Sequence, residues 1–69
     1  MPSTIEVKLV YDPPSRSYRG MKGELLDKFE RQFVEMTLAE FGGNLSAAAK
    51  ALRMDRKHLR DLAKKHRLR

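Results

Sequence analysis

Two consecutive glycines, at positions 42 and 43, divide the most regular part of this 69-residue chain. Before them, residues 23–41 carry apolar side chains at intervals of three and four, the spacing of an amphipathic helix. After them come Asn44 and an alanine-rich run, residues 45–52. Glycine readily adopts the left-handed conformation that follows many helix C-termini. The pair therefore predicts that one long helix ends there and that a new element begins.

The sequence after the glycines predicts two short helices joined by a tight turn. Asn44 is well placed to cap residues 45–52, because its side-chain oxygen can accept from amides of the first turn. Residues 53–55 interrupt the pattern, and Asp55 can cap a second helix over residues 56–65. The expected inward positions are Leu45, Ala48, Ala49 and Leu52 on the first helix, Leu59, Leu62 and Ala63 on the second, and Met54 between them.

Residues 1–22 are predicted to form a linker or strand-containing arm, separate from a domain over residues 23–69. The start of the arm alternates apolar and charged side chains, as a strand does: Ile5, Glu6, Val7, Lys8 and Leu9. Two prolines stop the pattern, and residues 15–22 have the composition of a loop. A single strand has no partner within its own chain. Either the arm is unstructured, or it pairs with a second copy as an intersubunit ribbon.

The charge of the chain is concentrated in its last third. The formal net charge is +6, yet residues 42–69 hold nine basic and two acidic residues, against three and five in residues 21–41. This distribution predicts that one surface meets a polyanion. The apolar runs are far shorter than the roughly 20 residues of a membrane span, and there is no cysteine for a disulfide or thiolate metal site. We therefore expect a soluble, cytoplasmic chain without a membrane partner.

The apolar face of residues 23–41 is wider than one short helix can cover, which predicts a homodimer. A domain of this size rarely stabilises a monomer by more than roughly 3 to 5 kcal/mol, so association is favoured. One stripe would pack on the two short helices and the other on a second copy; the alternative is that the whole face is core. The predicted dimer interface consists of Leu26, Phe29, Phe33 and Met36.

Two short helices with a basic second member describe a helix-turn-helix, in which the second helix enters the major groove of DNA. The forked donors of arginine match O6 and N7 of guanine, so Arg56 and Arg60 are predicted to read bases. Phosphate contacts are predicted for Lys57, Lys64 and Lys65, and, with the backbone amides at the start of the first helix, for Asn44 and Ser46.

The segment GGNLSAAAKAL, followed by a turn and DRKHLRDLAKKH, resembles the Fis-type helix-turn-helix found at the C-terminus of NtrC-like, sigma-54-dependent transcriptional activators. The resemblance covers roughly residues 25–68. It implies an all-α fold whose long first helix pairs two subunits on a partly palindromic site, tethering a bacterial regulator to its promoter or enhancer. By position, it implies DNA contacts at Asn44 and Ser46, and base contacts at Arg56, Lys57, His58, Arg60 and Asp61.

Two positions depart from the family pattern. Arg53 stands in the turn where glycine is common, so the turn must accept a side chain, with strain if φ is positive. Asp61 stands where related proteins often carry a polar or basic contact. It could accept from a cytosine amino group, but an ion pair with Lys57 and Lys65, one turn away on either side, is the favoured interpretation.

Other functions are weighed against DNA binding through this motif. Residues 23–41 could instead dock into a partner protein, or residues 5–10 could enter the groove as in a ribbon-helix-helix dimer. His58 and His66 lack the spacing of a helical metal pair. Although Ser46, His58 and Asp61 have the side chains of a hydrolytic triad, nothing positions an oxyanion hole. No enzyme activity, metal, cofactor or small-molecule substrate is expected.

Overall fold

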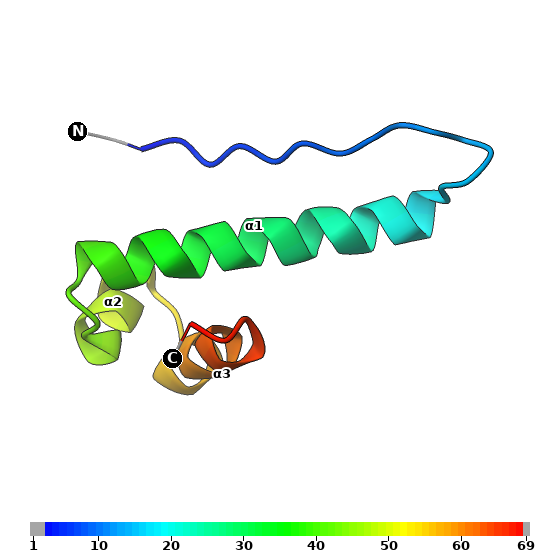
Figure 1. The fold of residues 1–69 in the computed structure, drawn as a ribbon. Helices are drawn as coiled ribbons and strands as arrows, with labels where there is room; N and C mark the ends of the chain where they lie inside the picture. Colours follow the sequence, from blue (N-terminus) through cyan, green and yellow to red (C-terminus); the bar gives the residue numbers. More distant parts are fainter. Residues whose placement is uncertain (1–2, 69) are drawn as a thin grey trace.

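Three helices make up the fold in this computed structural model, which describes residues 3–68 (Figure 1). They are α1 (Tyr18–Glu40), α2 (Leu45–Leu52) and α3 (Arg56–Lys65). Within residues 3–68 there is no β-strand, so the predicted all-α class is confirmed. The long α1 lies across the two short helices, and both predicted short helices have the expected bounds.

The first helix begins five residues earlier than predicted. Ser17 is its N-cap, with extended backbone angles and a side-chain Oγ that accepts from the Gly20 amide at 3.0 Å. Residues 18–22 are therefore helical rather than loop, because a capping serine outweighs the low helix propensity of the glycines that follow. The first turn holds no acidic residue. The division of the chain at residue 22 falls inside α1 and stays a prediction.

Each helix ends on the same backbone turn, centred on one residue of positive φ. These residues are Gly42 (φ 59°), Arg53 (φ 58°) and Arg67 (φ 57°). In each turn the next amide donates to the carbonyl five residues back: Gly43 to Leu38 (2.8 Å), Met54 to Ala49 (2.9 Å) and Leu68 to Ala63 (2.8 Å). This is the Schellman pattern, which satisfies carbonyls that the helix end leaves free. Two of the three turns use arginine, so the strain anticipated at Arg53 is present.

The core is small and depends on alanine. Val34 of α1 and Leu59 of α3 are fully buried, and Ala48, Ala49 and Ala63 surround them with Leu45. The alanine side chains let three helices approach one another closely, as their positions predicted. Leu62 and Met54 are half-buried against this core. Leu52 is also half-buried, but it lines a hollow with Ile5 and Phe33 instead. The other inward positions expected for α2 and α3 are confirmed.

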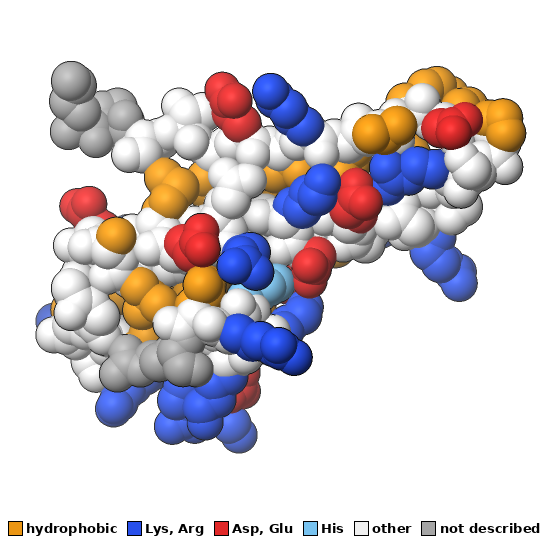
Figure 2. Space-filling model, viewed as in Figure 1, with side chains coloured by type: hydrophobic (Ala, Val, Ile, Leu, Met, Phe, Trp, Pro, Cys, Tyr) orange, Lys and Arg blue, Asp and Glu red, His pale blue; other side chains and the backbone are white. Residues whose placement is uncertain are grey.

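The N-terminal arm, residues 3–14, runs back along α1 on the side away from α3 (Figure 1). Ile5, Val7 and Leu9 are half-buried, while Glu6 and Lys8 between them are exposed. A band of hydrophobic surface separates the arm from α1 in Figure 2. The alternation thus gives an extended segment, as predicted, but the segment lies on a helix and pairs with no strand among residues 3–68.

Replacing Arg53 by glycine should stabilise the fold. A left-handed non-glycine residue costs about 1 kcal/mol, and the added entropy of glycine in the unfolded chain offsets part of the gain. We expect the free energy of unfolding to rise by roughly 0.5 kcal/mol in urea denaturation. Lys50→Gly, inside α2, is the control and should lower it by about 1 kcal/mol. A lower free energy of unfolding for Arg53→Gly than for the wild type would contradict the presence of backbone strain at Arg53.

Candidate nucleic-acid interface

The outer face of α3 is a stripe of four exposed side chains: Lys57, Arg60, Asp61 and Lys64. Leu59 and Ala63 are fully buried and fix which side of α3 faces inward. Because an α-helix turns about 100° per residue, Lys57, Asp61 and Lys64 lie opposite that buried side, and Arg60 lies at its border. Arg56 and His58 are also exposed and flank the stripe at the start of the helix. Every residue predicted to contact bases is therefore accessible.

The start of α3 is fixed by its cap. Asp55 has extended backbone angles, and its Oδ1 accepts from the Lys57 amide at 2.8 Å. This bond sets where the first turn begins and hence where Lys57 and Arg60 project. Lys and Arg side chains gather along the edge of the molecule formed by the short helices in Figure 2. The face can neutralise several phosphates and offers arginine donors for a base edge.

Asp61 does not make the ion pair that the sequence favoured. Within residues 3–68 it is exposed and takes part in no salt bridge. Lys65, one of its two expected partners, instead places Nζ 2.9 Å from Oε1 of Glu30 on α1. The prediction of a pair with Lys65 is wrong, because an inter-helix carboxylate competes for the ammonium. The alternative, a base contact by Asp61, stays a prediction.

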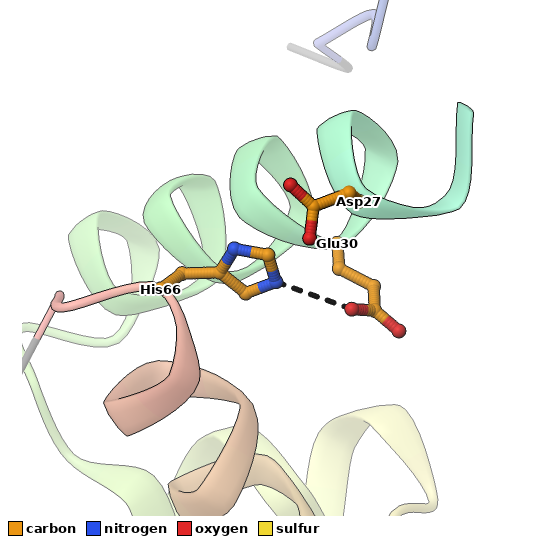
Figure 3. Close-up of side chains that lie close together, drawn as sticks. All are labelled: Asp27, Glu30 and His66. Atoms are coloured by element: carbon orange, nitrogen blue, oxygen red, sulfur yellow. Dashed lines mark hydrogen bonds and ion pairs between the residues drawn. The ribbon is translucent and has the colours of Figure 1, made fainter. Parts of the chain in front are cut away.

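A cluster of charged groups ties the end of α3 to the middle of α1 (Figure 3). His66, only 7 % exposed, lies with Nε2 3.1 Å from the same Glu30 oxygen that Lys65 contacts. Lys65 first, and His66 second, lower the pKa of Glu30 below its ordinary value by hydrogen bonding to its carboxylate. Glu30 in turn raises the pKa of Lys65. These contacts fix the angle at which α3 presents its outer face.

Asp27 completes a group that resembles a metal-ligand set. One ligand atom from each of Asp27, Glu30 and His66 lies within 4.8 Å of the other two. The Lys65 ammonium contacts Glu30 directly and opposes a second cation there. We therefore assign the group as an ion-pair cluster. Sequence reasoning missed it because His66 was compared only with His58, whereas its partner is 36 residues away.

The start of α2 has the predicted cap. Oδ1 of Asn44 accepts from the Ala47 amide at 3.1 Å. Asn44 and Ser46 are both exposed. Because the Asn44 oxygen is engaged in capping, only its amide nitrogen remains to donate to a phosphate, together with the Ser46 hydroxyl and nearby backbone amides.

The residues predicted for the dimer interface fall into two pairs. Leu26 and Phe29 are 50 % and 42 % exposed on α1. Phe33 and Met36 are half-buried and line a hollow together with Ile5 of the arm. The Phe29 and Phe33 rings pack with centroids 5.6 Å apart. This contact joins the exposed pair, Leu26 and Phe29, to the half-buried pair, Phe33 and Met36.

A capped short helix, a tight left-handed turn and a second helix with a basic outer face define a DNA-binding helix-turn-helix. The chain belongs to the Fis family of bacterial regulatory proteins, whose family model matches residues 25–61, a little over half of the chain. No significant match was found among curated proteins or among solved structures. No helix within residues 3–68 has both the length and the apolar character that a membrane span needs.

Removing the charge of Glu30 should loosen α3 from α1. Glu30→Gln is expected to lower the free energy of unfolding at pH 7 by about 1 kcal/mol, because the two donors lose an ionised acceptor. The lowered pKa of Glu30 means that its carboxylate stabilises the fold above the ordinary carboxyl pKa of about 4.3, and that this contribution disappears as pH falls through the folded-state value. The two proteins should therefore converge in stability once the pH falls below the folded-state pKa of Glu30.

Glu35→Gln is the matched control, and all three proteins are measured by urea denaturation from pH 7 down into the acid range. Glu35 contacts only Arg31, at 3.7 Å within α1. Its loss should cost roughly 0.3 kcal/mol. Equal effects of the two substitutions at pH 7 would contradict a special role for the inter-helix cluster.

Proposed function

We propose that this chain binds double-stranded DNA sequence-specifically as a homodimer and tethers a bacterial transcriptional regulator to its promoter or enhancer. The observation that carries the proposal is the outer face of α3. It is basic, exposed and held at a fixed angle by the core and the Glu30 cluster. A helix presented in this way fits the major groove, which is about 12 Å wide.

The exposed residues of α3 have two proposed roles: some contact base edges and others contact phosphates. Arg60, in the middle of α3, and Arg56, at its start, have the forked donors that suit guanine. Lys57 and His58 lie beside them in the first turn, within reach of base edges. Lys64 lies at the far end of the face and suits a phosphate. Lys65 is already paired with Glu30, so a phosphate would have to share its ammonium.

The exposed part of α1 supports a homodimer. Leu26 and Phe29 place large apolar side chains in solvent on the helix that the family resemblance assigns to subunit pairing. Burying them against a second copy would remove apolar surface from water, at about 25 cal/mol per Å². Two copies related by a two-fold axis would present two α3 helices to successive major grooves.

A sigma-54-dependent activator is the parent protein we propose, acting in the cytoplasm on the bacterial nucleoid. The glycine pair, the capping asparagine and the alanine run of residues 42–52 support this assignment through the resemblance described above. The arm argues against a ribbon that enters the groove. It lies on the opposite side of α1 from α3, and two of its carbonyls accept hydrogen bonds from α1 side chains.

Selection of bound duplexes from a random DNA pool tests the proposal. The expected result is one enriched motif with two-fold symmetry and half-sites about one helical turn apart. Enrichment of no motif would overturn sequence-specific binding, and an asymmetric single half-site would overturn the dimer. Glu6→Ala should select the same motif, whereas a groove-entering ribbon would select a different one.

Two substitutions on α3 separate reading from positioning. Arg60→Ala should weaken binding to the selected motif by roughly 1 to 3 kcal/mol and affect random duplexes much less. Lys64→Ala should weaken both alike and reduce the salt dependence of binding by about one phosphate contact. Arg19→Ala, which removes an exposed charge at the start of α1, should change neither. Equal losses on motif and random DNA for Arg60→Ala would contradict its reading role.

A further inference from the structure

The arm leaves one of its two backbone edges unpaired. In an extended chain, successive residues direct their N–H and C=O groups to alternate edges. The Glu6 and Lys8 carbonyls face α1, where they accept from Gln32 Nε2 at 2.6 Å and Lys28 Nζ at 3.0 Å. The opposite edge carries the backbone groups of residues 5, 7 and 9, which make no hydrogen bond within residues 3–68. Such an edge is a template for another strand.

The unpaired edge lies beside the exposed apolar surface of α1. The arm covers the stripe of α1 that includes Leu25, which lines a hollow with Leu9. At about 100° per residue, Lys28 and Gln32 fall on one side of Leu25, and Leu26 and Phe29 fall on the other. Since the bonded edge faces Lys28 and Gln32, the free edge faces Leu26 and Phe29. A second copy packed on those two side chains would bring its own arm alongside.

We propose that two copies of the chain join their arms as an antiparallel, two-stranded ribbon centred on Val7. The inference rests on the homodimer of the proposed function and adds a second contact to it. Val7 lies opposite Val7 of the second copy, and Ile5 lies opposite Leu9. These are the pairs that exchange backbone hydrogen bonds, and they use the groups that each arm leaves free. The apolar side chains stay on α1.

Charge selects this register. With Val7 at the centre, Glu6 of each copy lies directly opposite Lys8 of the other, in the closely spaced pairs where side chains interact most. A neighbouring register centred on residue 6 would set Glu6 against Glu6, and one centred on residue 8 would set Lys8 against Lys8. Both side chains are exposed and free of salt bridges within residues 3–68. They are therefore available to a second copy.

Charge reversal tests the pairing, with sedimentation as the readout. Glu6→Lys and Lys8→Glu each set like charges opposite at two places, so each should raise the dimer dissociation constant about threefold to thirtyfold. Combining both changes in one chain should restore the wild-type value. Glu35→Lys, which changes the net charge equally on α1, is the control and should leave dissociation unchanged.

Mixing the two single variants gives the sharpest prediction. A Glu6→Lys chain paired with a Lys8→Glu chain regains an opposite-charge contact at both places, so heterodimers should exceed the statistical half of the population. An arm that lies only on its own α1 gives no such preference. A statistical mixture would overturn the ribbon.

A disulfide tests the centre of the register. The chain contains no cysteine. Val7→Cys should cross-link two copies on mild oxidation, because the α-carbons of a hydrogen-bonded pair are about 5.5 Å apart, within disulfide range. Val10→Cys is the control: in this register the two residues at position 10 are about 20 Å apart. Cross-linking at position 10 as fast as at position 7 would overturn the register.

The outcomes for the ribbon and for the proposed function are distinguishable. Statistical mixing and no preferential cross-link at position 7, in a chain that is dimeric and selects a symmetric DNA motif, would reject the ribbon alone. A chain that sediments as a monomer both free and on its selected DNA would reject the homodimer and the ribbon together.

Discussion

Close packing of alanine against Val34 and Leu59 is the constraint on which this small fold depends. Where the three helices meet, Ala48, Ala49 and Ala63 have only a methyl group as side chain. The helices can therefore pack closely around the two large buried side chains, Val34 and Leu59. A larger residue at any of these alanines would force the helices apart, because protein interiors have little spare volume. The same packing turns one side of α3 inward and leaves the opposite side, with its basic residues, in solvent.

The angle of α3 also depends on polar contacts at its far end. His66 is buried beside Glu30, and Lys65 shares the same carboxylate oxygen. Hydrogen bonds to a charged group contribute more than neutral ones, so this cluster adds orientation where the apolar core ends. The Schellman turn at Arg67 brings Leu68 back against the core. The C-terminal end of α3 is thus held by both polar and apolar contacts.

The arm and the exposed part of α1 make one continuous surface. The arm covers α1 between Leu9 and Ile5, and beside it Leu26 and Phe29 remain in solvent. The arm lies on the opposite side of α1 from α3 (Figure 1). Association of two copies there would leave both basic faces open, which separates the function of pairing subunits from that of binding DNA.

Elements whose signals are local could be predicted from the amino-acid sequence. The glycine pair, the caps at Asn44 and Asp55, and apolar spacing of three and four gave the bounds of α2 and α3 and the inward faces, because each signal acts within one or two turns. The start of α1 was placed too late, since a single serine cap before two helical glycines is a weak local signal. The partners of Lys65 and His66 and the position of the arm on α1 became known only from the folded chain. Those contacts join residues 20 to 36 positions apart, and no local pattern records which distant side chain folding brings alongside.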